Sequence, residues 1–304
     1  MSAPSLINIQ SPRVRPHADL EWPARLELLR QDLARYACVV VAYSGGVDSS
    51  VVLRVAHEVL GEHAHAVIGR SDSYAAHELE LALAQAHSFG AQVEIVTTGE
   101  LADPVFASNP SNRCYHCKSE LYRQLDAVAA RVGAAAVLDG TILEDLGDHR
   151  PGRLAAAEHE VRSPLADLGF TKPDVRAVAE SFGLASHDKP ASPCLASRIP
   201  YGTAITQAIL GQVERSEMAL RELGFREFRV RHHGDVARIE VAISELPRML
   251  QTGIREEVVT SVIATGYRYV CVDLEGFRSG SLNRVLENSS GAQDNSGTAP
   301  SDAR

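Results

Sequence analysis

The chain has 304 residues, of which 45% are hydrophobic and 23% charged, values typical of a globular protein with one large or two modest domains. Its net charge of −9 gives no electrostatic support for binding nucleic acids. No apolar run approaches the length of a membrane span and no signal-peptide pattern is visible, so we expect a cytoplasmic protein without a membrane partner.

The first 20 residues are polar, contain prolines and show no hydrophobic period, which indicates a loose arm. Strand and helix patterns then alternate, an order typical of a parallel, doubly wound α/β sheet. We predict strands at 38–43, 64–68, 92–97 and 135–139. We predict the helices of this domain at 23–35, 51–60, 75–89, 119–132 and 173–182. In such a sheet, ligands bind beyond the carboxyl ends of the strands.

The first strand runs into a short glycine turn and then into a helix. This geometry is suited to phosphate, because unpaired amides and the positive end of a helix dipole favour an anion. Two glycines without a Cβ allow the backbone to come close to a ligand, and serine hydroxyls add hydrogen-bond donors. The predicted phosphate-binding residues, which the resemblance named next assigns to ATP, are Ser44, Gly45, Gly46, Asp48, Ser49 and Ser50.

No lysine follows these glycines, so the turn is not a Walker A loop. The pattern Ser-Gly-Gly-x-Asp-Ser resembles instead the PP-loop of the ATP pyrophosphatase superfamily, the adenine nucleotide alpha hydrolase-like proteins. The resemblance implies attack on the α-phosphorus of ATP, with pyrophosphate and an adenylated substrate as products. A plain serine–glycine turn with Asp48 as a helix cap is the competing interpretation.

The predicted strand 135–139 ends in Asp139-Gly140-Thr141 at the same edge of the sheet, and acidic residues follow. Carboxylates are the usual protein ligands of the Mg²⁺ that accompanies ATP. We therefore predict Asp48 and Asp145 as magnesium ligands and Gly140 as a further ATP-binding residue. A solvated acidic loop is the alternative explanation for the residues after Thr141.

The hydrophobic pattern changes after Pro200-Tyr201-Gly202. We predict helices at 206–223 and 246–265, and strands at 226–232, 237–241 and 267–274. This order suggests a small α+β domain with a mostly antiparallel sheet. The predicted domains are therefore 21–202 and 203–286, between the arm at 1–20 and a disordered tail at 287–304.

Five cysteines in a cytoplasmic chain favour thiol or metal chemistry over disulfides. Cys114 and Cys117 form a C-x-x-C pair, which has the spacing of metal ligands and also of a redox pair. Cys38 and Cys271 fall in or beside apolar strands, where free cysteine usually fills the core. Cys194 is the third candidate ligand, and three thiolates on a four-iron cluster would leave one iron open for chemistry.

Several motifs together resemble the LarE family over about residues 20–285. They are Ser44-Gly45-Gly46-Val47-Asp48-Ser49, Leu138-Asp139-Gly140-Thr141, Arg150-Pro151-Gly152, Ser197-Arg198-x-Pro200-Tyr201-Gly202 and Gly276-Phe277-Arg278-Ser279-Gly280. LarE proteins are ATP-dependent sulfur transferases of nickel-pincer nucleotide cofactor synthesis. The resemblance implies that each carboxylate of pyridinium-3,5-biscarboxylic acid mononucleotide is adenylated and then converted to a thiocarboxylate. It also implies a homo-oligomer, a hexamer built as a trimer of dimers.

The LarE family divides by its source of sulfur. One branch sacrifices a single cysteine, but in this chain Pro193 stands at that position and Cys194 follows it. The other branch carries a C-x-x-C pair and a Pro-Cys, and binds a four-iron four-sulfur cluster that takes up sulfide or another sulfur donor. This second pattern matches Cys114, Cys117 and Cys194, which we predict as catalytic residues together with Asp48.

The nucleotide substrate implied by this resemblance carries a phosphate, for which an arginine fork is suited. We predict Arg198 and Arg278, inside the family motifs, and Arg229 as its ligands. Arg229 alternates with Arg231 along one predicted strand and Arg238 lies on the next, a pattern equally typical of a solvated face.

Four other functions compete with this one. They are a transferase that sacrifices Cys194, a PP-loop tRNA thiolase, an amidotransferase of the NAD or GMP synthetase kind, and a non-enzymatic ATP-binding module. The tRNA thiolases usually add zinc-finger cysteines and a basic surface, neither of which this sequence has. The last two functions leave the three cysteines unexplained.

Overall fold

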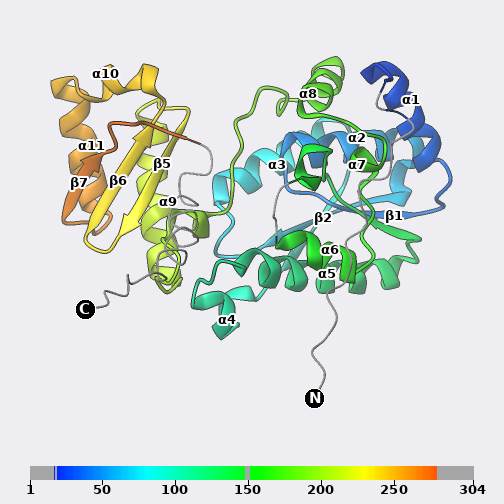
Figure 1. Ribbon diagram of the computed structural model, residues 1–304, viewed down its shortest axis with the longest axis horizontal. Coiled ribbons are helices and arrows are strands. Elements are labelled where there is room, and N and C mark those ends of the chain that lie inside the picture. Colours follow the sequence, from blue (N-terminus) through cyan, green and yellow to red (C-terminus); the bar gives the residue numbers. More distant parts are fainter. Residues whose placement is uncertain (1–16, 18, 148–150, 279–304) are drawn as a thin grey trace, which may run out of the picture. The chain divides into compact units, whose positions relative to one another are not determined.

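The computed structural model describes residues 17, 19–147 and 151–278, in two compact units (Figure 1). The first unit runs to Phe106 and continues from Ser111 to Ser192, and the second consists of Ala107–Pro110 and the chain from Pro193 onward. The main division between the units falls between Ser192 and Pro193, ten residues before the predicted domain boundary at residue 202. Most of the predicted arm at 1–20 and the predicted tail at 287–304 fall outside the described residues. Among the helices that are described, none is long and apolar enough to cross a membrane.

Four parallel strands form the sheet of the first unit, in the order β3-β2-β1-β4. They are β1 (Val39–Ala42), β2 (Ala64–Arg70), β3 (Val93–Thr97) and β4 (Ala136–Leu138). The apolar run of β1 is that of a strand covered on both faces, whereas the edge strand β3 is partly exposed. The prediction of a parallel α/β sheet is therefore confirmed.

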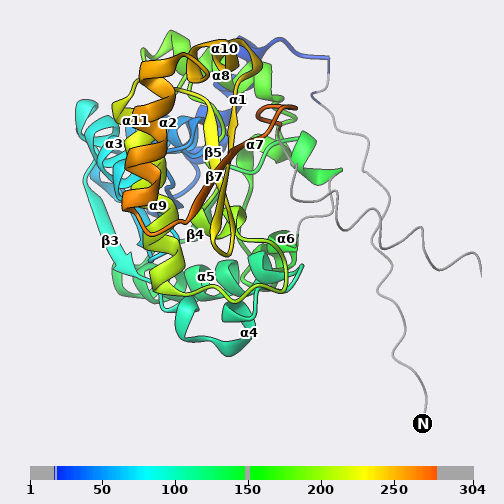
Figure 2. The ribbon, with the colours of Figure 1, turned by 90° about the vertical axis from the view of Figure 1, so that its left-hand side faces the viewer.

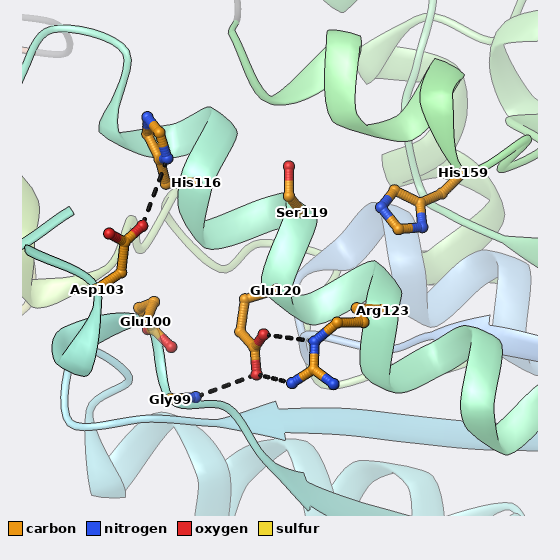
Figure 3. Close-up of a pocket in the computed structure, with 8 residues that line it drawn as sticks. All are labelled: Gly99, Glu100, Asp103, His116, Ser119, Glu120, Arg123 and His159. Atoms are coloured by element: carbon orange, nitrogen blue, oxygen red, sulfur yellow. Dashed lines mark hydrogen bonds and ion pairs between the residues drawn. The ribbon is translucent and has the colours of Figure 1, made fainter. Parts of the chain in front are cut away.

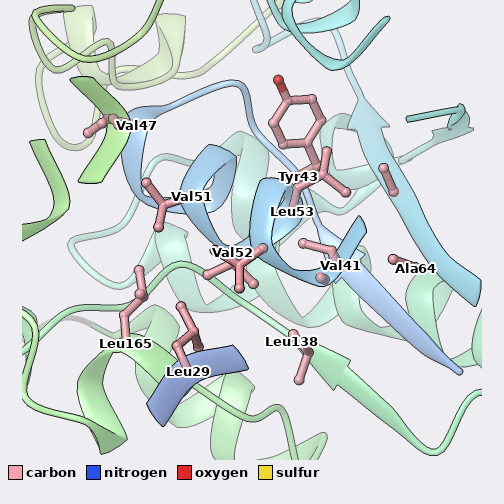
Figure 4. Packing of buried hydrophobic residues seen from close by; sticks show 14 of the residues in the cluster. Leu29, Val41, Tyr43, Val47, Val51, Val52, Leu53, Ala64, Leu138 and Leu165 are labelled. Carbon is pink, nitrogen blue, oxygen red and sulfur yellow. The ribbon is translucent and has the colours of Figure 1, made fainter. Parts of the chain in front are cut away.

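Helices cover both faces of this sheet (Figure 1). Val39 and Val41 of β1 pack in a core with helices on one face (Figure 4), and Val40 and Ala42 pack in a second core with helices on the other. The helices before residue 193 are α1 (Trp22–Leu33), α2 (Val47–Leu60), α3 (Ala76–Ser88), α4 (Pro104–Ala107), α5 (Arg113–Val132), α6 (Gly152–Glu158), α7 (Pro164–Asp167) and α8 (Lys172–Ser181). Short 3-10 turns are η1 (Gly61–His63), η2 (Glu100–Ala102) and η3 (Glu144–Leu146).

Helix α5 begins at Arg113, so the predicted start at residue 119 is wrong. The residues before 119 lack an apolar period, but tertiary packing makes them helical. The first turns of α5 pack against α6, where a Cβ on Gly152 would lie 3.0 Å from Lys118 Cγ and 3.5 Å from the Cys114 carbonyl oxygen. The C-x-x-C pair therefore lies on the first two turns of a helix.

The second unit has a three-stranded sheet in the order β5-β6-β7, with β5 (Phe228–His233), β6 (Val236–Val241) and β7 (Tyr269–Val272). Strands β5 and β6 are antiparallel, but β7 runs parallel to β6 because a helical crossover connects them. Helices α9 (Gln207–Glu222) and α11 (Thr252–Ala264) lie against one face of this sheet (Figure 2). The predicted helix 246–265 is interrupted at Leu250 and Gln251 and forms α10 (Leu246–Met249) and α11. The unit also contains the 3-10 turns η4 (Leu195–Arg198) and η5 (Ile243–Glu245).

The short segment 107–110 joins the second unit through the side chain of Asn109, which is fully buried. Its Nδ2 donates to the carbonyl oxygens of Ile199, Pro200 and Thr203 at 3.3, 2.8 and 3.0 Å. Its own carbonyl accepts from the Gly202 amide at 3.0 Å. One asparagine from the middle of the chain therefore closes the loop that follows η4.

Candidate active site

The glycine turn lies between β1 and α2, at the carboxyl edge of the first sheet. Gly45 has φ of +66°, and a Cβ there would lie 2.5 Å from the Cβ of Ala82 on α3. The hydroxyls of Ser44 and Ser49 are 3.1 Å apart across the turn. No side chain caps α2, whose N-cap is Gly46, so its first amides point toward the turn as they do in anion sites.

Ser50 lies behind the turn and is fully buried. Its hydroxyl donates to the Gly46 carbonyl at 2.8 Å and accepts from Gln85 Nε2 at 2.6 Å. Gln85 of α3 also accepts from the Ser186 amide at 2.8 Å, so it braces the turn against the segment after α8. The sequence analysis missed Gln85, a polar side chain on the buried face of α3 beside Ala82 and Ala86, which is the signal that could have found it.

Asp48 lies in the first turn of α2, and Lys172 Nζ is 2.7 Å from both of its carboxylate oxygens. Burial raises the pKa of Asp48, the ammonium of Lys172 lowers it, and the nearby charge of Asp145 raises it. The charges of the two predicted magnesium ligands, Asp48 and Asp145, therefore repel one another. The sequence analysis missed Lys172, because 124 residues separate it from Asp48.

The end of β4 comes directly against the turn. Asp139 is held by the hydroxyls of Thr141 at 2.8 Å and Ser163 at 2.7 Å. A Cβ on Gly140 would lie 2.5 Å from the Ser49 amide nitrogen and 2.9 Å from the Asp48 carbonyl carbon. Gly140 is therefore required because two backbone segments meet at the glycine turn.

We expect Gly140→Ala to lower the free energy of unfolding by about 1–3 kcal/mol, because the overlapping atoms are backbone and one segment must move. The same shift should weaken ATP binding. The matched control is Gly147→Ala, where the nearest atom is 3.8 Å from the added Cβ. Denaturant titration and calorimetric titration with ATP measure both effects, and equal behaviour of the two variants would contradict the prediction.

Cys114 and Cys117 are three residues apart on α5 and thus on one side of the helix. Cys114 is exposed and Cys117 half-buried. Lys118 follows them, and its pKa is raised by Tyr122, then by Asp139 and both cysteines, against the opposing effect of burial. The Lys118 ammonium lies over the ring of Tyr122, with Nζ 5.4 Å from its centroid.

Cys194 lies in the second unit, half-buried, immediately before η4. Arg198 fixes the loop that carries it: the guanidinium donates to both oxygens of Glu217 at 2.8 and 2.9 Å and to the Cys194 carbonyl at 3.0 Å. Arg198 is only 2% exposed. Its contacts are those of a loop anchor, and its predicted role in binding phosphate stays a prediction.

None of the five cysteines forms a disulfide. Cys38 is buried, as predicted, but the prediction that Cys271 fills the core is wrong, because it lies on the outward side of the edge strand β7 and is exposed. Within the described ranges, no three His, Cys, Asp or Glu residues form a group that could hold a metal ion. Cys114 and Cys117 lie in the first unit and Cys194 in the second, and the cluster that their thiolates could hold stays a prediction.

Arginines gather on the face of the second sheet that faces away from α9 and α11. In register, Arg231 of β5 lies beside Arg238 of β6, and Arg229 lies beside Glu240. Arg231 Nη2 is 2.7 Å from Glu240, and its Nη1 donates to the Ser197 carbonyl at 2.9 Å. Burial, followed by the charges of Arg198 and Arg231, lowers the pKa of Arg229 to about 10. Arg229 and Arg231 are buried, so this is not a solvated face.

Arg278, the third predicted phosphate ligand, lies two residues after Gly276 in the turn that follows β7. It forms an ion pair with Glu275. The hydrogen bond to Glu275 raises the pKa of Arg278. This contact orients the side chain along its own turn, and its role in binding phosphate stays a prediction.

A cavity of about 320 Å³ opens on another side of α5 (Figure 3). Its lining includes Glu120, which accepts from Arg123 at 2.8 and 2.9 Å, and His116, which lies 3.5 Å from Asp103. The full lining is Gly99, Glu100, Asp103, His116, Ser119, Glu120, Arg123 and His159. None of these residues is among the predicted site residues.

Comparisons with known proteins find relatives that cover most of the chain. The sequence profile of the NAD synthase family matches residues 22–124. An uncharacterized protein of Synechocystis sp. is 46% identical over 263 residues, which cover 86% of this chain and 98% of that protein. Pyridinium-3,5-bisthiocarboxylic acid mononucleotide synthase of Lactiplantibacillus plantarum is 40% identical over 264 residues, 86% of this chain and 94% of that enzyme. A tRNA-specific 2-thiouridylase of Chlorobium luteolum is 29% identical over 212 residues, 59% of this chain and 58% of that protein.

Proposed function

The chain belongs to the family of pyridinium-3,5-bisthiocarboxylic acid mononucleotide synthase, the LarE family, and from this premise we propose that it is an ATP-dependent, adenylating sulfur transferase. Its substrate is pyridinium-3,5-biscarboxylic acid mononucleotide. A carboxylate oxygen of the substrate attacks the α-phosphorus of ATP and pyrophosphate leaves. A sulfur nucleophile then attacks the carboxyl carbon of the adenylate and AMP leaves, and the sequence repeats on the second carboxylate.

The observation that carries this proposal is the turn between β1 and α2. It combines the uncapped amides of α2 with the neighbouring hydroxyls of Ser44 and Ser49, and these groups would hold the β- and γ-phosphates. Asp48 and Asp145 have the hard oxygen donors that Mg²⁺ prefers, so they would hold the metal that neutralises the phosphate charge. No Walker lysine is present to promote attack at the γ-phosphate.

The second unit would bind the phosphate of the nucleotide substrate. Arg229 is the best-supported ligand, because it is a buried guanidinium whose pKa is lowered first by burial and then by the positive charges of Arg198 and Arg231. An anion arriving there would relieve that repulsion, as charge-assisted hydrogen bonds to arginine do. Arg198 would act through the loop that it anchors, and Arg278 from its turn after β7.

Cys114, Cys117 and Cys194 would hold a four-iron four-sulfur cluster. Such a cluster, ligated by three thiolates, has one iron open to an external sulfur ligand and so supplies a sulfur source that can be reloaded. The ammonium of Lys118 faces the pair on α5 and would favour their thiolate forms. The sacrificial alternative, in which Cys194 itself gives up its sulfur, is distinguished by the iron content discussed below.

Product analysis tests the proposed function. Anaerobic incubation with ATP, Mg²⁺, the mononucleotide and sulfide should yield AMP, pyrophosphate and a substrate in which oxygen is replaced by sulfur, measured by chromatography and mass spectrometry. ADP as the nucleotide product would contradict the proposal. So would AMP formation that does not depend on the mononucleotide.

Lys172→Met should raise the KM for ATP by about 10- to 100-fold, because a charge-assisted hydrogen bond is lost. We expect the ammonium to pass from Asp48 to a phosphate oxygen once Mg²⁺ occupies the carboxylate. Lys172→Arg keeps the charge and should recover much of the loss. Steady-state kinetics with varied ATP measure the effect, and an unchanged KM in Lys172→Met would place this ion pair outside the ATP site.

A further inference from the structure

Gln85 of α3 contacts the chain on both sides of the glycine turn. Its Nε2 donates to the Ser50 hydroxyl at 2.6 Å and to the Tyr43 hydroxyl at 3.3 Å. Tyr43 directly precedes the turn, and Ser50 lies near the start of α2, which follows it. Gln85 is only 7% exposed. One buried side chain therefore connects the two segments between which the glycines lie.

The hydrogen bonds around Gln85 fix which end of its amide group faces the turn. Its Oε1 accepts from the Ser186 backbone amide at 2.8 Å, and a backbone N–H can only donate. The NH₂ end must therefore point toward the two hydroxyls, since a flipped amide would set one N–H against another. Tyr43 donates its own proton to the Ala82 carbonyl at 2.9 Å, so toward Gln85 it accepts.

The polarity of these contacts continues through Ser50 into the turn. Because Ser50 accepts from Gln85, its single proton is donated to the Gly46 carbonyl at 2.8 Å. Gly46 is the N-cap of α2, and its C=O shares a rigid peptide plane with the N–H of Val47. A fixed direction of this C=O therefore fixes the direction of the Val47 amide, one of the amides at the start of α2 that suit an anion.

We infer that Gln85 is a positioning residue for ATP, which acts through Ser50 to hold the Gly46–Val47 peptide and so aims the Val47 amide at a phosphate. Ser50 is 0% exposed and acts on ATP only through this peptide, although its sequence position predicts a direct ligand. The inference rests on the proposed function, since it takes the glycine turn as the phosphate site. A turn that leaves this conformation part of the time binds ATP more weakly by the fraction that remains competent.

Gln85→Met keeps the length of the side chain and removes both ends of the amide. We expect it to weaken binding of Mg²⁺–ATP and of Mg²⁺–pyrophosphate by about 5- to 30-fold in calorimetric titration, because the turn loses its buried hydrogen bonds. The KM for ATP should rise by the same factor, while kcat and the KM for the mononucleotide stay unchanged. A residue that only stabilises the fold would lower the melting temperature without this selective loss of affinity.

Ser50→Ala tests the same chain of hydrogen bonds from its other end, and it keeps the test decisive if Gln85→Met does not fold. It should weaken pyrophosphate binding by a similar factor, with little further effect when added to Gln85→Met. The matched control is Gln124→Met on α5, which removes a 3.0 Å hydrogen bond to Glu120 and should leave pyrophosphate binding unchanged.

The outcomes separate this inference from the proposed function. If Ser50→Ala weakens binding but Gln85→Met does not, Ser50 acts on the phosphate directly, so the role of Gln85 is overturned and the phosphate site stands. Parent-like binding by both variants, or losses that add in the double variant, would overturn it as well. If the parent protein binds neither Mg²⁺–ATP nor Mg²⁺–pyrophosphate, the proposed function fails and the inference fails with it.

Discussion

Asp48→Ala is expected to lower the rate of AMP and pyrophosphate formation by about 10²–10³-fold, the loss typical of removing a preorganised electrostatic contact. Asp48 is placed at the first turn of α2, where Mg²⁺ and the phosphates would meet. Without this carboxylate, the Lys172 ammonium is left facing the turn and the metal loses a ligand. Both changes should slow the transfer of the adenylyl group from ATP to the substrate carboxylate.

The fold should survive this change. The side chains of Asp48 and Lys172 are 25% and 41% exposed, so water can solvate the ammonium that is left behind. A matched control is Asp167→Ala, which breaks the exposed pair of Asp167 with Arg162. Chromatography of the nucleotides should show that only Asp48→Ala loses AMP formation. Thermal unfolding should give similar melting temperatures for Asp48→Ala and Asp167→Ala. An unchanged AMP yield would remove Asp48 from the mechanism.

Replacing any one of Cys114, Cys117 and Cys194 with alanine should remove both the bound iron and the capacity for repeated sulfur transfer. Anaerobically purified protein should contain about four irons per chain, the content of a single four-iron cluster. A cluster that loses one of three protein ligands is not held. Colorimetric iron analysis, visible absorption and the number of sulfur atoms transferred per chain measure the effect.

Two cysteines serve as internal controls. Cys38→Ala removes a buried thiol and should cost stability but not iron, since Cys38 lies beside β1 in the core. Cys271→Ala changes an exposed thiol on β7 and should alter neither. The proposal fails if the protein is active without iron and Cys194 becomes dehydroalanine after one transfer. That result would identify Cys194 as the sulfur donor.

The sequence predicts the first sheet and the turn at Ser44 well, because both depend on local patterns. An apolar strand, two glycines and the start of a helix are contiguous, and their chemistry can be recognised without a partner elsewhere. The start of α5 is different. Arg113 to Lys118 carry no apolar period, and their helical form depends on packing against α6. The C-x-x-C pair could be found from sequence, but its place on a helix could not.

Contacts between distant residues mark the other limit. Lys172 reaches Asp48 across 124 residues, and Gln85 reaches Ser186 across 101. Neither lysine nor glutamine stands in a pattern that specifies such a partner. Burial is also hard to predict from sequence. The alternation of Arg229 and Arg231 along β5 predicts that they share one face of the sheet, but it does not predict that both side chains are buried.

The hydrogen bonds of Asn109 to the loop after η4 affect how the second unit folds during synthesis and whether it can be produced alone. The polypeptide passes between the two units three times, at residues 106/107, 110/111 and 192/193. A ribosome delivers Asn109 long before its acceptors at Ile199, Pro200 and Thr203, so the second unit completes its packing only when its downstream portion has been synthesised. A fragment that starts at residue 193 would leave those carbonyls without the asparagine amide. The second unit is therefore poorly suited to expression as a separate fragment or to fusion with another protein. Any such fragment should include residues 107–110.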